Sequence, residues 1–342
     1  MRVARWYSNN DVRVEEIPVP DITAGEMLVR IEACGICGSD VMEWYRIDRA
    51  PLVLGHEVGG QVVQVGEGVL QYHKGDRVTV AHHVPCDACK YCLSGHHTMC
   101  DTLRTTNFYP GGLSEFVRLP EIIVDRGVFV IPDSMSYREA TFVEPTACVL
   151  RGLRKTGMKP GDTVLVIGSG IGGLIYVQLA KHMGAAKVIA TDISEYRLGM
   201  AKKLGADVVI SADDDVPARL KDLNQGYLAD VVVLCTGATS AVRQALDSVE
   251  RSGTVLFFAA TGPGVEIPFS VNDTFWRNDV TLTTSYAASP DDYREALELV
   301  RQGVVNTELM TTHVLPMDEV GRGFQLVARA GESVKVIIEP QK

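Results

Sequence analysis

The sequence predicts an α/β protein of two domains, and three observations carry this prediction. The chain has 342 residues, which is more than a single hydrophobic core usually serves. Residues 1 to about 140 are rich in turns and in short strands that contain Val and Ile. Beyond that point, apolar runs alternate with amphipathic stretches, which is the pattern of βαβ units around a parallel sheet with both faces covered.

The expected elements follow the same division. In the first part, strands are predicted in EMLVRIEACGICGSD, GGQVVQVGEGV and KGDRVTVAHHV. In the second part, buried strands are predicted in DTVLVIG, AKVIATD, DVVVLC, GTVLFFAA and VTLTTS, with helices in IGGLIYVQLAKHMG and SEYRLGMAKKLG. After about residue 287, SPDDYREALELVRQG predicts a helix capped by Ser289, and SVKVIIEP predicts one more strand that rejoins the first domain.

Composition excludes some classes of function. The formal net charge of −10 argues against nucleic-acid and anionic-membrane partners, because both require basic surfaces. No stretch is apolar enough to be a signal peptide or a membrane span, so we expect a cytoplasmic protein. In a reducing compartment, clustered cysteines bind metal more often than they form disulfides.

A glycine-rich turn marks the predicted nucleotide site. Gly168, Gly170 and Gly173 have the G-x-G-x-x-G spacing between a strand and a helix, and the next strand ends at Asp192. Such a turn lets the backbone approach a pyrophosphate at a helix N-terminus. The Asp192 carboxylate would bind the adenosine ribose and repel a 2′-phosphate, which favours NAD over NADP, and Arg197 can bind the same ribose. The alternative is a turn that only packs a helix on the sheet.

Four cysteines in one loop form the first candidate metal site. Cys86, Cys89, Cys92 and Cys100 lie within VPCDACKYCLSGHHTMC, and four thiolates close a tetrahedron that leaves no position for substrate. This arrangement is typical of structural zinc. A cluster of free thiols is the alternative. Imidazole ligation is less favoured while four thiols are available, although four histidines lie nearby: His82, His83, His96 and His97.

A second candidate site is dispersed along the chain. It comprises Cys37 in CGICGSD, His56 and Glu57 in LGHEVGG, and Glu144 in FVEPTACV. A mixed shell of Cys, His and carboxylate with an open position suits a catalytic zinc. Each residue also has an ordinary explanation, as a buried thiol, a turn histidine or a carboxylate at a helix start, and spacing alone leaves both interpretations open.

Together these stretches resemble the zinc-dependent medium-chain dehydrogenase/reductase family, most closely its polyol and threonine dehydrogenase branch. The resemblance extends through CGICGSD, GHEVGGQVVQVGEGV, GDRV, the four-cysteine loop, EPTACVLRGL, VLVIGSGIGGL and CTGA. It implies a GroES-like β-barrel catalytic domain at residues 1–145 and 288–342, with a structural zinc lobe at about 84–101. It also implies a Rossmann-type, doubly wound parallel-sheet domain that binds NAD at residues 146–287.

The resemblance also implies roles for individual residues. Cys37 and His56 would bind the catalytic zinc, and Glu57 and Glu144 would bind it directly or through water and exchange as substrate enters. Ser39 is similar to the hydroxyl that begins a proton relay. The four clustered cysteines would hold the second, structural zinc. Further cofactor contacts are implied at Ile171, Gly172, Thr236 and Gly237.

The sequence departs from the family pattern beside the predicted substrate site. Many relatives have His at the position of Met42, and the segment from Cys37 to His56 spans only 19 residues, which is short for the branch. The relay and the identity of the substrate therefore do not carry over. Aromatic residues that are candidates for the pocket wall, although each is more often structural, are Trp44, Tyr45, Phe108, Phe275 and Trp276.

The leading hypothesis is an NAD-dependent enzyme that oxidises a secondary alcohol in a polyol, cyclitol or sugar and works as a homodimer or homotetramer. A threonine 3-dehydrogenase-like enzyme is the alternative within the same class. A zinc-stabilised nucleotide-binding protein without catalytic activity is the alternative from another class. A zinc ribbon that binds nucleic acid is excluded by the charge and by the single cysteine cluster.

Overall fold

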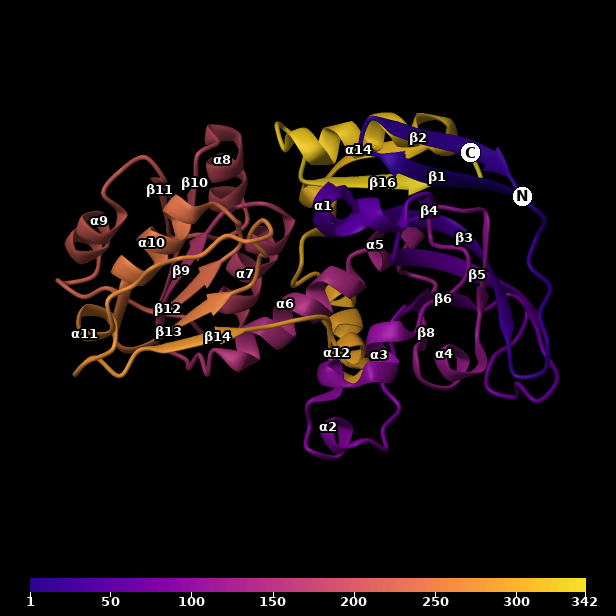
Figure 1. The fold of residues 1–342 in the computed structure, drawn as a ribbon, viewed down its shortest axis with the longest axis horizontal. Helices are drawn as coiled ribbons and strands as arrows, with labels where there is room; N and C mark the ends of the chain where they lie inside the picture. Colours follow the sequence, from indigo (N-terminus) through magenta and orange to yellow (C-terminus); the bar gives the residue numbers. More distant parts are fainter. The chain divides into compact units, whose positions relative to one another are not determined.

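The computed structural model describes all 342 residues, which form two compact units. The first unit combines Met1–Ala147 with Ala287–Lys342, and the second is Cys148–Tyr286 (Figure 1). The first unit is dominated by antiparallel sheet, whereas the second contains a parallel sheet with helices packed against it. The predicted fold class is therefore confirmed.

Two sheets build the first unit. A seven-stranded sheet has the order β15-β16-β3-β5-β6-β8, with β7 paired to β3, and a three-stranded sheet has the order β2-β1-β4. The strands of the large sheet are β3 (Met27–Gly35), β5 (Glu57–Val65), β6 (Arg77–Val80), β7 (Phe116–Leu119), β8 (Val128–Val130), β15 (Thr311–Pro316) and β16 (Lys335–Glu339). Those of the small sheet are β1 (Arg2–Ser8), β2 (Asp11–Glu16) and β4 (Leu52–Val53).

The C-terminal segment completes the first unit. Strand β16 pairs with β3 in antiparallel orientation, and β15 lies parallel to β16. All but the last residue of β16 are buried, because the strand lies inside the sheet between two neighbours. The prediction that SVKVIIEP rejoins the first domain is confirmed.

Short helices connect the strands of the first unit. The predicted helix after residue 287 is α12 (Pro290–Arg301), and Ser289 caps it through the backbone N–H of Asp292. The remaining α-helices of this unit are α1 (Glu43–Arg46), α2 (Lys90–Leu93), α3 (Asp101–Thr105), α4 (Glu121–Arg126), α5 (Tyr137–Ala140), α13 (Thr307–Met310) and α14 (Val320–Arg329). Four 3-10 turns are η1 (Gly38–Val41), η2 (Ile47–Arg49), η3 (His97–Met99) and η4 (Met317–Glu319).

The second unit is a parallel sheet in the order β11-β10-β9-β12-β13-β14. The chain starts in the middle of the sheet, proceeds to one edge, returns to the centre and proceeds to the other edge, which is a doubly wound topology. The strands are β9 (Thr163–Ile167), β10 (Lys187–Asp192), β11 (Val208–Ser211), β12 (Ala229–Leu234), β13 (Val249–Phe257) and β14 (Thr281–Thr284). The helices are α7 (Ile171–His182), α8 (Glu195–Lys203), α9 (Val216–Leu223), α10 (Thr239–Asp247) and α11 (Val271–Thr274), while α6 (Val143–Lys155) spans the boundary between the units.

Burial explains which strands the sequence revealed. All five residues of β9 are buried, and β12 is buried at five of its six positions, so both appear as continuous apolar runs. Strand β11 is an addition to the predicted strands. It has only four residues, one of them fully buried, and acidic residues follow it closely, so its apolar signal is weak.

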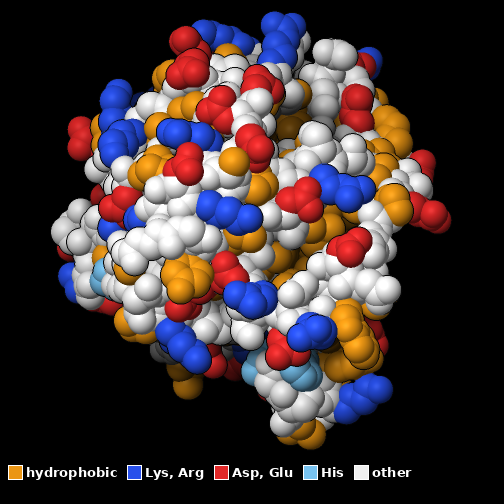
Figure 2. Space-filling view, turned by 90° about the vertical axis from the view of Figure 1, so that its left-hand side faces the viewer, with side chains coloured by type: hydrophobic (Ala, Val, Ile, Leu, Met, Phe, Trp, Pro, Cys, Tyr) orange, Lys and Arg blue, Asp and Glu red, His pale blue; other side chains and the backbone are white.

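The surface carries charged side chains of both signs (Figure 2). On the face drawn in Figure 2, acidic and basic side chains are interspersed with apolar ones. Such a face offers no continuous basic track of the kind that neutralises nucleic-acid phosphates. The structure contains no helix that is both long enough and apolar enough to span a bilayer.

Two isoleucines four residues apart provide a matched test of the core of the second unit. Ile189 is fully buried in β10, whereas Ile193 is 80% exposed directly after that strand. Ile189→Ala should lower the free energy of unfolding by about 2–5 kcal/mol, because a cavity remains in the sheet. Ile193→Ala should change it by less than about 0.5 kcal/mol. Urea unfolding of both variants measures the difference, and equal losses would contradict the predicted core.

Candidate active site and metal centres

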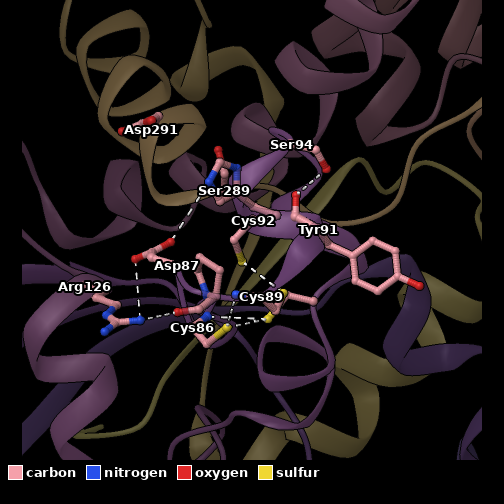
Figure 3. A network of polar contacts seen from close by, with 12 residues as sticks. Cys86, Asp87, Cys89, Tyr91, Cys92, Ser94, Arg126, Ser289 and Asp291 are labelled. Carbon is pink, nitrogen blue, oxygen red and sulfur yellow. Dashed lines mark hydrogen bonds and ion pairs between the residues drawn. The ribbon is translucent and has the colours of Figure 1, made fainter.

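The four clustered cysteines converge in the first unit. Their sulfur atoms all lie within 4.8 Å of one another, and all four are free thiols. The Cys89 and Cys92 sulfurs are 3.6 Å apart (Figure 3). The Cys86 and Cys100 sulfurs are also 3.6 Å apart. The loop around α2 and α3 therefore forms a compact all-sulfur site.

Backbone N–H groups stabilise negative charge on this cluster. The Cys86 N–H donates to Cys100 Sγ at 3.4 Å, and the Cys89 N–H donates to Cys86 Sγ at 3.3 Å. Hydrogen bonds from the Ala88 and Cys89 N–H groups lower the pKa of Cys86. Burial opposes ionisation of Cys100, but donors that include the Cys86 and Leu103 N–H groups lower the pKa of its thiol to about 6. Such donors suit zinc, which binds thiolates.

Arg126 ties the cysteine loop to α4. Its Nη1 lies 3.5 Å from the Asp87 carboxylate (Figure 3). The same Nη1 donates to the Pro85 carbonyl at 2.7 Å, and the Asp87 carboxylate is also near His97. The group of converging sulfurs includes none of the four nearby histidines. His83 instead contacts the Thr106 carbonyl through Nδ1 at 2.6 Å.

Three of the four residues of the dispersed site also converge. Ligand atoms of Cys37, His56 and Glu57 lie within 4.8 Å of one another. Cys37 comes just after β3 and caps η1, whereas His56 and Glu57 lie where β5 begins. Because β3 and β5 are neighbours with Gly35 opposite Glu57, the end of one strand meets the start of the other. The fourth predicted ligand, Glu144, is outside this group, in the first turn of α6 with 8% exposure.

Glu57 has one oxygen paired and one without a partner. Its Oε2 forms an ion pair with Lys335 on β16, and both side chains are only 1% exposed. Its Oε1 is buried and has no hydrogen-bond partner in the protein. A buried carboxylate oxygen beside a thiol and an imidazole is a suitable metal ligand, so the residues fit a zinc ion.

Asp40 and Arg46 surround the histidine of this site. Asp40 is fully buried, and its Oδ1 lies 3.5 Å from His56 Nδ1 and 3.7 Å from an Arg46 nitrogen. Burial favours the neutral carboxyl, but the positive charges of His56 and Arg46 outweigh it and lower the pKa of Asp40. A carboxylate behind a ligating histidine orients the imidazole and fixes its tautomer.

Three residues that surround this site were not among the predicted ones: Asp40, Arg46 and Lys335. A signal for Asp40 was available, since it follows Cys37 by three residues in CGSD and completes a capping box with it. Lys335 carried no local signal, because its partner Glu57 is 278 positions away in the sequence.

Aromatic rings lie beside the candidate metal site. The His56 and His82 ring centroids are 4.8 Å apart, and Phe108 meets His82 edge-on at 6.5 Å. Burial, together with the neighbouring His83, lowers the pKa of His82 well below its usual value, so this ring is neutral.

Of the predicted pocket aromatics, Phe108 is buried, whereas Trp44 and Tyr45 are each 44% exposed. Phe275 and Trp276 belong to the second unit.

The glycine-rich turn has the geometry required for close approach of a dinucleotide. Gly168 has a φ of 93°, which favours glycine. A Cβ at Gly173 would collide with the Gly168 carbonyl oxygen, so helix α7 can lie against the turn only with glycine there. Gly170 caps α7 without any side-chain hydrogen bond, which leaves the first N–H groups of the helix available to an anion.

Asp192 and Arg197 lie next to this turn. Asp192 accepts hydrogen bonds from the Ser169 N–H at 2.8 Å and the Ser194 N–H at 2.9 Å. The Arg197 Nε is buried and has no hydrogen-bond partner. The Arg197 Nη1 lies close to Gly170, 3.9 Å from the point that a Cβ would occupy if that glycine carried a side chain. A guanidinium with an unused donor beside the turn fits an anionic or hydroxylated ligand.

The other predicted cofactor residues lie around the same turn. Gly168 approaches Cys235 and Thr236, which follow β12, and a Cβ at Gly172 would contact Phe258. At Gly237, a Cβ would meet the Ala260 carbonyl oxygen. These loops lie at the carboxyl ends of β9 and β12, where doubly wound sheets bind ligands.

Comparison with known proteins agrees with this geometry. Residues 23–132 match the alcohol dehydrogenase GroES-like domain, and residues 170–302 match the zinc-binding dehydrogenase domain. The sequence is 30% identical to sorbitol dehydrogenase of Bacillus subtilis (strain 168), over 100% of this chain and 98% of that protein. The chain belongs to the zinc-dependent medium-chain dehydrogenase/reductase family, in its polyol dehydrogenase branch.

Solved structures of dehydrogenases also have the fold of this chain. This dehydrogenase superimposes on 2R,3R-butanediol dehydrogenase from Bacillus subtilis with a TM-score of 0.86 at 28% identity, covering 99% of each chain. A zinc-binding dehydrogenase fold from Sinorhizobium meliloti 1021 bound to NADP gives a TM-score of 0.88 at 28% identity, again over 99% of each chain. The predictions of an alcohol or polyol dehydrogenase, with zinc and a nicotinamide dinucleotide as cofactors, are confirmed at this level.

The Glu57–Lys335 pair can be tested through stability. Lys335→Met should lower the free energy of unfolding by about 3–5 kcal/mol, because it leaves a buried carboxylate without its counterion. Lys342→Met is the matched control, since Lys342 pairs with Glu339 while 65% exposed, and it should cost less than about 1 kcal/mol. The double variant Glu57→Gln/Lys335→Met should recover much of the loss. Denaturant unfolding measures all three, and a Lys335→Met protein as stable as Lys342→Met would contradict the assignment.

Proposed function

We propose that this dehydrogenase uses zinc and NAD to oxidise a secondary alcohol in a polyol, cyclitol or sugar. The observation that carries the proposal is the convergence of Cys37, His56 and Glu57, with an unpartnered Glu57 oxygen beside the thiol and imidazole. These three residues would leave one position of a tetrahedral zinc for an exchangeable ligand, as catalytic sites require. Sorbitol dehydrogenase and butanediol dehydrogenase among the relatives support this class of substrate.

Each side chain has a defined part in the reaction. Cys37, His56 and Glu57 would hold the zinc, with Glu144 as a further ligand, direct or through water, that exchanges when substrate enters. Zinc supplies a Lewis acid that lowers the pKa of an alcohol hydroxyl. NAD would supply the acceptor for a hydride from the alcohol carbon, and the alcohol oxygen would give up a proton, so that the products would be a carbonyl compound and NADH.

Charge around the site favours this chemistry. With Cys37 as a thiolate and His56 neutral, the side chains carry the negative charges of Cys37, Asp40 and Glu57. The positive charges are those of Lys335 and Arg46. Glu144, the further ligand, adds a fourth negative charge, so two negative charges are in excess and a dication would balance them. The dication would then stabilise, at short range, negative charge that develops on a substrate oxygen.

The second unit would bind NAD. The glycine-rich turn from Gly168 to Gly173 would receive the pyrophosphate, and Asp192 would accept hydrogen bonds from the adenosine ribose hydroxyls. Arg197 would contact the same ribose, and Thr236 and Gly237 would line the site. We further propose that Cys86, Cys89, Cys92 and Cys100 hold a structural zinc, and that the enzyme works in the cytoplasm as a homodimer or homotetramer.

A substrate screen tests the proposed function directly. Zinc-loaded protein with NAD should reduce the cofactor in the presence of at least one of sorbitol, xylitol, myo-inositol or 2,3-butanediol, followed at the absorbance of NADH. L-Threonine is included to test the alternative of a threonine dehydrogenase-like enzyme. Oxidation of L-threonine faster than that of every alcohol in the screen would overturn the polyol assignment. A protein that binds zinc and NAD yet oxidises none of these alcohols would contradict the proposal.

The two zinc sites should respond differently to loss of one thiol. Wild-type protein should contain two zinc ions per chain. Cys37→Ser should retain about one zinc and the wild-type melting temperature while losing turnover, because the open site lies at β-strand ends that fold without it. Cys89→Ser should lose the other zinc and melt earlier, because the metal closes its loop. Elemental analysis and thermal melts measure both, and the same metal loss with the same destabilisation in the two variants would refute the division.

The proposed role of Asp192 can be tested through the preference of the enzyme for NAD over NADP. Asp192→Ala should raise the KM for NAD about tenfold and reduce discrimination against NADP, since it removes ribose hydrogen bonds and the charge that repels a 2′-phosphate. Asp192→Asn is the control that keeps an acceptor for one backbone N–H group while removing the charge, and it should also relax discrimination. Steady-state kinetics with both cofactors provide the measurement. An unchanged preference in both variants would remove Asp192 from this role.

A further inference from the structure

Arg46 covers the hydroxyl of Ser39 at the candidate active site. Its Nη2 donates to Ser39 Oγ at 3.4 Å, and its Nε donates to the Ser39 carbonyl oxygen at 3.3 Å. The guanidinium lies over the Tyr45 ring at 4.6 Å, and the Arg46 side chain is only 15% exposed. The short segment after η1 therefore places a partly buried, stacked cation against Ser39.

The chemistry of these neighbours restricts what Ser39 can do. A guanidinium only donates hydrogen bonds and stays protonated in proteins, so Ser39 Oγ accepts from Arg46 and cannot pass a proton to it. Met42, which ends η1 and precedes α1, has a thioether that carries no proton. The single hydroxyl proton of Ser39 is then free to point away from Arg46.

We propose that Arg46 is a positioning residue that fixes Ser39 as a hydrogen-bond donor to the reacting oxygen of the substrate. Ser39 keeps its own proton throughout, and the proton of the alcohol passes to water rather than along Ser39 and Arg46. The role expected from the family resemblance, in which Ser39 begins a relay, is replaced by a fixed donor. This inference depends on the proposed function, since it concerns the same site.

Arg46 also lies 3.7 Å from Asp40, which provides a competing explanation for any effect of its removal. Loss of Arg46 could disturb Asp40 and, through it, His56. The two explanations differ when Ser39 is absent. An effect through Asp40 persists in a Ser39→Ala background, whereas an effect through Ser39 disappears, so a double-mutant cycle separates them.

Binding of trifluoroethanol tests the inference without turnover. This alcohol binds through its oxygen but resists oxidation, and in cobalt(II)-substituted protein saturated with NAD its binding changes the visible absorption of the metal. Arg46→Met and Ser39→Ala should each weaken binding about tenfold, because an oriented donor to a charged oxygen is lost. The double variant should be no weaker than Ser39→Ala alone. Arg46→Lys, which also donates without accepting, should restore most of the affinity.

Arg49→Met is the matched control. Arg49 lies over the same Tyr45 ring at 5.3 Å and donates to the Tyr45 carbonyl oxygen, but no contact links it to Ser39, so binding should stay within twofold of wild type.

Unchanged binding in Arg46→Met, or an equal loss in the Ser39→Ala background, would overturn the inference. Wild-type protein that binds trifluoroethanol but oxidises none of the screened alcohols would overturn the proposed function instead. Failure of wild-type protein to bind cobalt(II) would overturn both.

Discussion

The buried ion pair between Glu57 and Lys335 is the interaction on which the candidate active site depends. The two side chains come from β5 and β16, which flank β3 on either side. A Cβ at Gly35 of β3 would collide with both, so a glycine in the middle strand makes the room for the pair. Because burying either charge alone is costly, β16 must be in register before Glu57 can offer its free oxygen to a metal. The C-terminal strand is therefore part of the site, although it lies far from it in the sequence.

The two predicted zinc sites use opposite physical strategies. The cysteine loop gathers four thiols within 15 residues, from Cys86 to Cys100, and backbone N–H groups stabilise their negative charge. Its geometry is largely local and closed. The second site takes its ligands from the ends of two neighbouring strands and its balancing charges, Lys335 and Arg46, from elsewhere in the first unit. Distributed ligands on a rigid sheet can leave one position open, whereas four thiolates from one loop complete a tetrahedron.

The fold and the candidate site were predictable from the sequence where the residues that form a feature lie close together in the chain or belong to a known motif. The β9–α7 turn was predictable because strand, glycines and helix are contiguous, and Cys37, His56 and Glu57 could be grouped because their motifs resemble a family. Strand β11 was missed because four residues with one fully buried position give no clear run. Lys335 was missed because a buried lysine inside an apolar strand is indistinguishable from a surface lysine until its partner is known. The polar residues that support a site are thus the part that sequence reasoning recovers least.

The segment after Cys37 shows how a departure from a family pattern can be compensated. Met42 stands where the family resemblance implies a histidine in many relatives, and its thioether carries no proton. The shortened loop instead brings Arg46 back to Ser39 and Asp40, and stacking on Tyr45 restricts the guanidinium. A permanent cation cannot reproduce the proton exchange of an imidazole, but it can orient the serine and offset the charge of Asp40 at once. With Met42 in place of a histidine and Arg46 against its hydroxyl, Ser39 therefore holds a proton in a fixed direction rather than carrying one.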